Sequence, residues 1–253
     1  MISSKKLLKK EKISHGFFNK NGGKSKGIYR SLNCGIGSSD KKHVVKKNLR
    51  IVKNKIDKNS KNILLVNQIH SNKFIYIGKN HKINKKRFKA DAIITNQKKL
   101  PIGILTADCV PILIYENSSK MIAAIHAGWR GAYKGIVNKV IKFMIKKGCE
   151  RKNIYAAIGP CISKQNYNVK ENFYKKFLKK NQKNKIFFKK RKKLIYFDLP
   201  KYIKSQLTFN KICAIDQINI DTFDIKNNFF SARRSLRQKD DDYGRNISII
   251  MIN

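Results

Sequence analysis

Three closely spaced aliphatic runs in the middle of the chain constrain its fold more than any other feature. The segments DAIITN, IGILTADCVPILIYE and MIAAIHAG are dense in Ile, Leu, Val and Ala, and each is too short for a separate long helix. Runs of this length and composition are typical of strands that are buried on both faces. The region from residue 91 to residue 128 is therefore expected to form strands of a central sheet.

The flanking segments predict further strands and helices. Residues 43–57 and residues 129–148 carry apolar side chains at helical spacing, and Gly148 marks the end of the second helix. NILLVNQIH, KFIYIG, NIYAAIGP, KICAIDQINI and ISIIMI predict strands, whereas FFSARRSLRQKDDDYGRN predicts a polar, basic loop. No internal repeat and no Pro/Gly-rich linker divides the chain.

The chain is strongly basic, with 58 Lys and Arg against 15 Asp and Glu and a formal net charge of +43. A single basic patch of that size would bind nucleic acid or anionic lipid. The basic residues instead run along the whole chain, which is typical of AT-rich codon bias, so nucleic-acid binding is not expected as the primary role. Phosphate-bearing ligands should still be attracted.

The segment Lys175–Lys193 is the most basic, with 11 basic residues among 19 and no acidic one. Its interleaved phenylalanines allow base stacking. The favoured interpretation is that Phe173, Phe177 and Leu178 form the buried stripe of an otherwise solvated helix.

Cysteine usage and hydropathy indicate the cytoplasm. The five cysteines form no CxxC pair, and the odd count is typical of reduced thiols. The N-terminal segment lacks the apolar core of a signal peptide, and no segment approaches the roughly 20 apolar residues of a membrane span.

Three side chains at the ends of predicted buried strands suggest a metal site. His70 follows ILLVNQI, Cys109 lies inside LTADCVP, and His126 follows MIAAI. Two imidazoles and one thiolate suit Zn²⁺ and leave a fourth position open for water or substrate. Their spacing matches no zinc-finger pattern, and the alternative is an inert core thiol with two hydrogen-bonded histidines.

The segment HAGWRGAYKG offers a second, independent signal. A strand that ends in His, a glycine turn and a following helix leave backbone N–H groups free to bind an anion. Arg130 in this turn can hold phosphate or carboxylate oxygens with its guanidinium fork. The alternative is a plain glycine turn with a surface arginine.

These segments also resemble a known family. HAGWRG, TADCVP, NQIHS, AAIGPCIS, FFSARR, GRN and the opening HGFFNKNGGKSKGIYRSLNCG look like the YfiH-like family, once named polyphenol-oxidase laccases and now described as purine nucleoside phosphorylases. The match runs over essentially the whole chain in the family's order, so residues 1–253 are expected to form one YfiH-like domain.

The resemblance implies a fold, a cofactor and an activity. The implied fold is an α/β (α+β) layered sandwich with mixed sheets flanked by helices. His70, Cys109 and His126 fall on the family's three zinc positions. The implied reaction is phosphorolysis of adenosine, inosine and methylthioadenosine, with nucleoside and phosphate as ligands and adenosine deamination as a companion activity.

Three departures from the family pattern bear on substrate range and leave the metal positions intact. Residues 167–170 read Tyr-Asn-Val-Lys where the family has Tyr-Glu-Val-Gly. Asp221-Thr222 replaces a Cys-Thr pair, and Leu49 replaces an arginine.

Further roles follow as hypotheses. Asp108 is a candidate for proton transfer during deamination, or else a structural cap of its turn. Arg130 and Arg233 are candidates for binding phosphate, and Asn33 and Gln68 for orienting ribose hydroxyls.

Two other enzyme classes are alternatives to this hypothesis. In one, Cys109 is the nucleophile and His126 its base, in a cysteine hydrolase that acts on a small amide or peptide, including a cell-wall precursor. A multicopper oxidase is disfavoured, because the chain has only five histidines. The sequence makes no prediction of oligomeric state.

Overall fold

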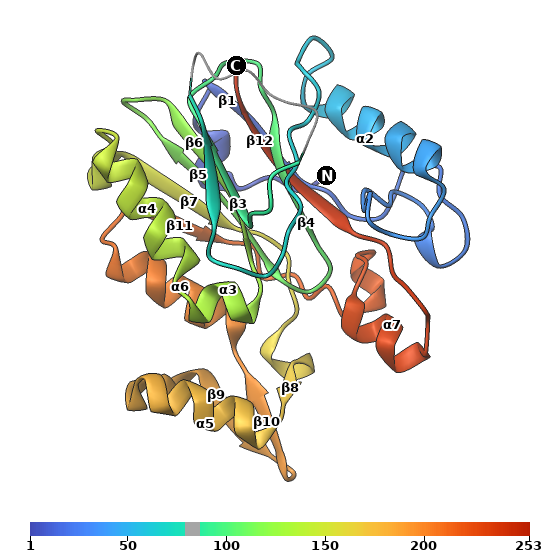
Figure 1. The fold of residues 1–253 in the computed structure, drawn as a ribbon, viewed down its shortest axis with the longest axis vertical. Helices are drawn as coiled ribbons and strands as arrows, with labels where there is room; N and C mark the ends of the chain where they lie inside the picture. Colours follow the sequence, from blue (N-terminus) through green and yellow to red (C-terminus); the bar gives the residue numbers. More distant parts are fainter. Residues whose placement is uncertain (79–86) are drawn as a thin grey trace.

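The centre of the chain forms the middle of a six-stranded mixed sheet (Figure 1). The computed structural model describes residues 1–78 and 87–253. The strands are β2 (Phe74–Ile77), β3 (Ala92–Thr95), β5 (Val110–Glu116), β6 (Met121–Ala127), β7 (Ile154–Ile158) and β11 (Ala214–Gln217), in the order β11-β7-β5-β6-β3-β2. β2 runs parallel to β3 and β11 parallel to β7, while the other neighbours are antiparallel. Every residue of β3, β5 and β6 is buried, which confirms these three central strands. The strand Ile102–Thr106, expected in the same sheet, pairs with the C-terminal strand in another sheet, so this part of the prediction was wrong.

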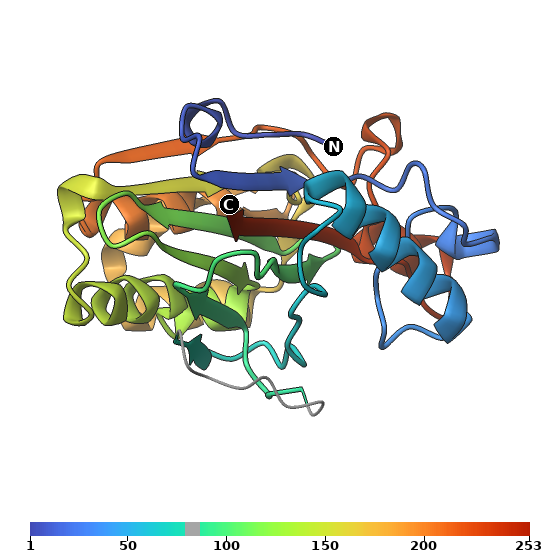
Figure 2. The same ribbon diagram turned by 90° about the horizontal axis from the view of Figure 1, so that it is seen from above.

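A second sheet packs on one face of the first. It consists of β1 (Ile13–Phe17), β4 (Ile102–Thr106) and β12 (Asn246–Ile252), with β12 in the middle and both pairings antiparallel. Apolar side chains from these strands lie in one buried cluster with side chains from β5, β6 and β7. The two sheets therefore form a sandwich (Figures 1 and 2). The N-terminal strand β1 and the C-terminal strand β12 are neighbours in its smaller sheet.

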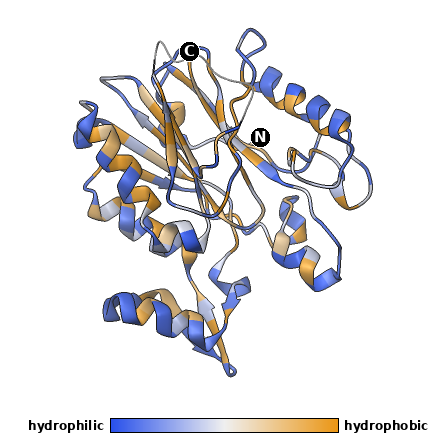
Figure 3. Ribbon diagram, in the orientation of Figure 1, coloured by the Kyte–Doolittle hydropathy of each residue, from blue (hydrophilic) through white to orange (hydrophobic). Residues whose placement is uncertain are grey.

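Helices cover the two outer faces of the sandwich. α3 (Trp129–Tyr133), α4 (Ile136–Lys146) and α6 (Leu199–Phe209) pack against the six-stranded sheet, and α2 (Lys42–Ile56) packs against the three-stranded sheet. α1 (Lys5–Leu8) and α7 (Ala232–Gln238) are short. The hydropathy colouring shows apolar strands inside and polar outer faces on the helices (Figure 3). This arrangement confirms the α/β (α+β) class with mixed sheets flanked by helices.

A small lobe extends from one end of the sandwich (Figure 1). It comprises β8 (Asn168–Val169), α5 (Glu171–Lys180), β9 (Phe188–Arg191) and β10 (Leu194–Phe197), with strand order β8-β10-β9. Phe173 and Phe177 stack with ring centroids 4.8 Å apart, and Phe177 is fully buried. Phe177 is thus buried, and Phe173 and Leu178 are partly buried, so the predicted stripe packs into the lobe along one side of α5.

Three predictions of local structure were wrong. NILLVNQIH makes only isolated bridges, at Leu64 and Asn67, because the Gln68 amide bonds both backbone groups of Leu105 in place of a strand partner. The helix predicted over residues 129–148 is divided into α3 and α4 at Gly135, whose φ of 76° is left-handed. The predicted C-terminal loop contains α7, because Ser231 caps it by accepting from the Arg234 N–H.

The described part of the chain contains no helix with the length and hydropathy needed to span a membrane.

Candidate metal centre

Strand pairing brings together two side chains that are distant in sequence. β5 and β6 are antiparallel, with Pro111 opposite His126, so Cys109, directly before β5, lies at the same edge as His126. His70 reaches this edge on the loop before β2. One potential ligand atom from each of the three lies within 4.8 Å of the others, and the His70 and His126 rings meet edge-on at 4.9 Å. This set can hold a metal ion.

Gly128 leaves the space in which these side chains meet. A Cβ atom at this position would lie 3.0 Å from Cys109 Sγ, 3.0 Å from His70 Cδ2 and 3.7 Å from His126 Cε1. The glycine turn after β6 therefore permits the close approach of all three side chains.

Asp91, at the start of β3, orients two of the three side chains. Its fully buried carboxylate accepts from His126 Nδ1 at 2.9 Å and from the His70 backbone N–H at 2.9 Å. Ser71 donates to the same carboxylate from its N–H and its hydroxyl, each at 2.6 Å. With Nδ1–H directed at Asp91, the Nε2 lone pair of His126 is left for a metal, which is the usual outer-shell arrangement of a histidine ligand.

The titration of the three groups reflects this geometry. Burial alone would raise the pKa of Asp91, but hydrogen bonds from His126 and Ser71 lower it to about 2. Burial likewise opposes ionisation of Cys109, yet the charge and hydrogen bond of His126, together with His70, lower its pKa to about 7. The thiolate and Asp91 in turn raise the pKa of His126 to about 9, against its burial. A thiolate at neutral pH is the form that binds metals.

A cavity of about 540 Å³ opens on the three side chains, and we call it the metal pocket. Its lining residues are Gly35, Ile36, Gly37, Val66, Asn67, Gln68, His70, Arg87, Leu105, Thr106, Ala107, Cys109, His126, Tyr243 and Arg245. The lining thus contains Arg87 and Arg245 and, among the described residues, no carboxylate, although the Arg245 guanidinium is paired with Asp242, outside the lining, at 3.0 Å. Such a pocket favours an anionic ligand.

Asp108 does not line the metal pocket. Its buried carboxylate accepts from Thr222 Oγ1 at 2.8 Å, Ser231 Oγ at 2.9 Å and the Arg233 N–H at 2.7 Å, and burial raises its pKa. These contacts tie the turn before Cys109 to the segment that leads into α7, which corresponds to the structural alternative for this residue.

The two candidates for ribose binding are both engaged with the backbone. Gln68 lines the pocket, but its amide donates to and accepts from Leu105 at 2.7 Å. Asn33 is fully buried, and its Oδ1 accepts from the N–H groups of Gly35 and Arg245 at 2.9 Å. Asn33 therefore links the pocket-lining segments that contain Gly35 and Arg245, without lining the pocket itself.

Arg130 and Arg233 lie outside the lining of the metal pocket. Arg130 is exposed on α3, with its guanidinium carbon 5.3 Å from the centroid of the Trp129 ring. Arg233 donates to the Asn168 side chain at 2.8 Å and lines a separate cavity that also contains Trp129. The structure does not bring these two arginines together.

Sequence reasoning missed Asp91, Arg87 and Arg245 as parts of the site. Asp91 directly precedes the buried run AIIT, and a carboxylate at the mouth of a buried strand was the available signal. Arg245 belongs to the GRN segment used for the family resemblance, without a role. Arg87 carried no signal in its sequence context.

Comparison with known proteins identifies the family. The model of the family described as multi-copper polyphenol oxidoreductase laccase matches residues 14–253. The chain belongs to this laccase-like family. The expected YfiH-like resemblance is confirmed, since a structure of the YfiH protein of Bacillus licheniformis is similar, with a TM-score of 0.86 and 26% identity over 95% of this chain and 93% of that one.

Two relatives of this chain are named purine nucleoside phosphorylase, and one further structure is similar in fold. One from Rickettsia prowazekii is 35% identical over 70% of this chain and 72% of its own. One from Bacteroides thetaiotaomicron is 30% identical over 92% and 91%. A structure of the Neisseria meningitidis protein NMB0706 has a TM-score of 0.84, with 26% identity over 96% and 95%.

Proposed function

We propose that this protein is a zinc-dependent purine nucleoside phosphorylase that acts on adenosine, inosine and methylthioadenosine, with adenosine deamination as a companion activity. The observation that carries the proposal is the convergence of His70, Cys109 and His126 on an arginine-lined pocket. The name shared by the relatives from Rickettsia and Bacteroides supports the same reaction class.

The donor set fits zinc. Two imidazole nitrogens and a thiolate are borderline-soft ligands, and three protein ligands leave a fourth tetrahedral position for catalysis. A zinc ion held by His70, Cys109 and His126 would supply Lewis acidity at the floor of the pocket. The same three donors also occur in type 1 copper sites, so metal analysis is part of the test.

The lining residues account for binding and orientation. Arg87 and Arg245 attract inorganic phosphate, and Asn33 fixes the backbone of Arg245 through its N–H. In phosphorolysis a phosphate oxygen forms a bond to C1′ of the ribose, the C1′–N9 bond breaks, and its electron pair leaves with the purine. Holding phosphate and nucleoside in one pocket removes the entropic cost of their encounter, and the guanidinium charges stabilise the phosphate during transfer.

Our proposal modifies the roles expected of the other residues. Asp108 positions Cys109 by fixing its turn, and Gln68 shapes the pocket wall. Arg130 and Arg233, outside the lining, take no part in phosphate binding in this scheme. Deamination needs a proton-transfer group, and the described lining offers no carboxylate, so phosphorolysis is proposed as the main activity. We place the reaction in the cytoplasm, where the five free thiols stay reduced.

The decisive experiment incubates pure, metal-analysed protein with adenosine and phosphate and separates the products by chromatography. Adenine with ribose 1-phosphate is the expected result, and inosine would report the companion deamination. Cys109→Ala should lose both bound zinc and turnover, whereas Cys213→Ala, at an exposed thiol, should retain both. A wild-type protein with copper, or with zinc and no nucleoside products, would contradict the proposal.

A second candidate is favoured by one observation. Cys109, His126 and Asp91 form a chain of nucleophile, base and orienting carboxylate, and the lowered pKa of Cys109 suits a nucleophilic thiolate. This arrangement suits the alternative function, a cysteine hydrolase that acts on a small amide or peptide. Chelation separates the two: the hydrolase keeps its activity after zinc removal, and the phosphorylase loses it until zinc is restored.

A further inference from the structure

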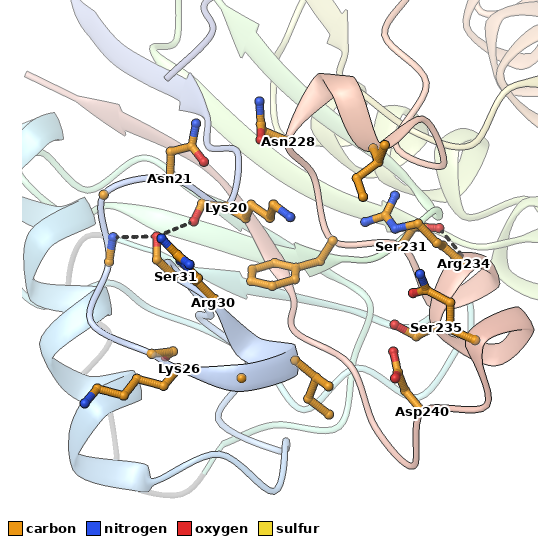
Figure 4. Close-up of a pocket in the computed structure, with 18 of the residues that line it drawn as sticks. Lys20, Asn21, Lys26, Arg30, Ser31, Asn228, Ser231, Arg234, Ser235 and Asp240 are labelled. Carbon is orange, nitrogen blue, oxygen red and sulfur yellow. Dashed lines mark hydrogen bonds between the residues drawn. The ribbon is translucent and has the colours of Figure 1, made fainter.

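A second, larger cavity lies away from the metal pocket, between the N-terminal loop of residues 20–31 and α7 (Figure 4). It measures about 1420 Å³ and shares no lining residue with the metal pocket. We call it the basin. Ligand pockets usually measure roughly 300–1,000 Å³, so the basin has room for a ligand the size of a nucleotide.

The side chains that line the basin carry mostly positive charge. Five of its lining residues are cationic, and one is acidic, Asp240; the cationic ones are Lys20, Lys24, Lys26, Arg30 and Arg234. Figure 4 shows Lys20 extending from the loop toward Arg234 on α7. The basin therefore joins positive charge from two distant parts of the chain.

Two of these cations, Lys20 and Arg30, lack an anionic partner. Among residues 1–78 and 87–253, their side chains form no hydrogen bond or ion pair. The Arg234 guanidinium donates to the carbonyl oxygens of Thr222, Phe223 and Phe229, and the charges of Asp108, Asp221, Asp224 and Asp240 act on it from nearby. Burial, together with the charges of Arg234 and Arg30, lowers the pKa of Lys20. Unpaired like charges held together in this way are unfavourable until an anion binds.

The loop that carries these cations is fixed in place. Asn48 of α2 is fully buried; it accepts from the Lys24 N–H at 2.8 Å and donates to Ser25 Oγ at 2.9 Å. Gly23 packs so closely against the end of the same loop that a Cβ at this position would lie 2.2 Å from the Ser31 carbonyl oxygen. A preorganised loop loses little entropy when a ligand binds.

We propose that the basin binds a di- or triphosphate chain, from a nucleotide or from inorganic polyphosphate, at a site separate from the metal centre. Several phosphate groups in a row match the spread of cations across the basin, whereas a single phosphate reaches only part of it. This site does not depend on the function proposed above, because its test measures binding and requires no turnover.

The test is calorimetric titration of the full chain with inorganic tripolyphosphate, ATP and orthophosphate at 0.15 M salt. One tripolyphosphate or ATP per chain is expected, with orthophosphate at least tenfold weaker. Equal affinity for tripolyphosphate and ATP supports recognition of the phosphate chain alone, and tighter ATP supports a nucleotide.

Matched variants separate the basin from the general positive charge of the chain. K20A/R30A should weaken tripolyphosphate binding at least tenfold, and Ser235→Glu, which puts a carboxylate on the basin side of α7, should do the same. K183A/K185A removes two exposed lysines elsewhere and should change affinity less than twofold. Arg234 is left intact, because its guanidinium also bonds the carbonyl oxygens of Thr222, Phe223 and Phe229 and its removal would disturb the segment that leads into α7. Melting temperatures confirm that each variant is folded.

The proposal is overturned if K20A/R30A and K183A/K185A weaken binding equally, or if many tripolyphosphates bind with no dominant site. It is also overturned if single-stranded RNA competes for the basin with higher affinity than either probe.

Discussion

At the scale of single residues, the candidate metal centre depends on two positions that bind no metal themselves. Asp91 fixes the His126 ring and the His70 backbone with one carboxylate, and Gly128 leaves the volume in which the three side chains approach one another. Both residues determine how the three side chains are positioned. Their substitution should therefore lower metal affinity while the protein stays folded.

Gly128→Ala should weaken zinc binding at least tenfold, because the added methyl would stand 3.0 Å from both Cys109 Sγ and His70 Cδ2. Zinc content after dialysis against a competing chelator measures the effect. Gly37→Ala is the matched control, since a Cβ there meets nothing within 4 Å. Equal zinc retention by the two variants would contradict this role of Gly128.

Asp91→Asn should lower zinc affinity by roughly 10- to 100-fold, the usual effect of removing a carboxylate behind a ligating histidine. The amide cannot match the carboxylate as acceptor for both His126 Nδ1–H and the Ser71 donors. Competition titration with a fluorescent zinc chelator gives the affinity. Asp241→Asn, at an exposed carboxylate, should leave it unchanged.

The three candidate metal ligands could be named from the sequence, and the residues that support them could not; their role as ligands stays a prediction. Each candidate ligand followed or interrupted a buried-strand run, which marks the edge of a sheet where side chains converge. Asp91 lies in an equally suggestive place, but nothing local shows that its carboxylate faces His126, 35 residues away. Gln68 lines the metal pocket and Asn33 does not, and the hydrogen bonds of both side chains to the backbone emerge only from the tertiary structure.

At the scale of elements, α1 is held against β1 and β11 by a small polar junction. The Ser4 N–H donates to His15 Nε2 at 2.9 Å, and Ser4 Oγ donates to Asp216 Oδ2 at 2.7 Å. Burial of His15 lowers its pKa from 6.5 to about 4, so the native protein keeps this ring neutral.

This junction predicts a pH effect on stability. Between pH 6.5 and 4 the unfolded chain binds a proton at His15 that the native protein does not, so stability falls as pH falls through this window and is unaffected above it. The full difference is on the order of 3 kcal/mol. In urea denaturation at pH 4 and pH 7, His15→Gln should lose less stability than wild type on acidification. His43→Gln, at an exposed histidine of α2, should behave as wild type.

Element prediction succeeded where hydrophobic periodicity was complete. The helix expected over residues 43–57 matches α2, and the aliphatic runs of the centre match β3 to β6. Prediction failed where one residue changes the backbone: Gly135 breaks the helix after β6, and the Ser231 cap starts α7 in a segment with polar composition. Such effects depend on a dihedral angle or a single hydrogen bond, which composition does not reveal.

At the scale of the whole molecule, the three buried clusters share strands. Side chains of β12 enter two of the clusters, on the two faces of the smaller sheet, and the six-stranded sheet likewise contributes to clusters on both of its faces. Loss of either sheet would expose apolar surface of its neighbour.

The assignment of residues 1–253 to one domain stays a prediction, and it implies one cooperative unfolding transition. Far-UV circular dichroism reports the sheets, and the single Trp129, whose ring lies 4.9 Å from that of Phe173, reports the junction with the small lobe. The two thermal transitions should coincide. An earlier transition in tryptophan fluorescence would show that the lobe around α5 unfolds by itself.

The potential ligands of the candidate metal centre come from stretches of chain that the six-stranded sheet brings together. An unfolded chain therefore has no preformed site, and an ion bound at the native site shifts the folding equilibrium by mass action, by about 2.7 kcal/mol when free zinc exceeds its dissociation constant 100-fold. For the zinc enzyme proposed above, withdrawing the metal should lower the melting temperature as well as the activity, so the amount of folded protein should follow the metal supply.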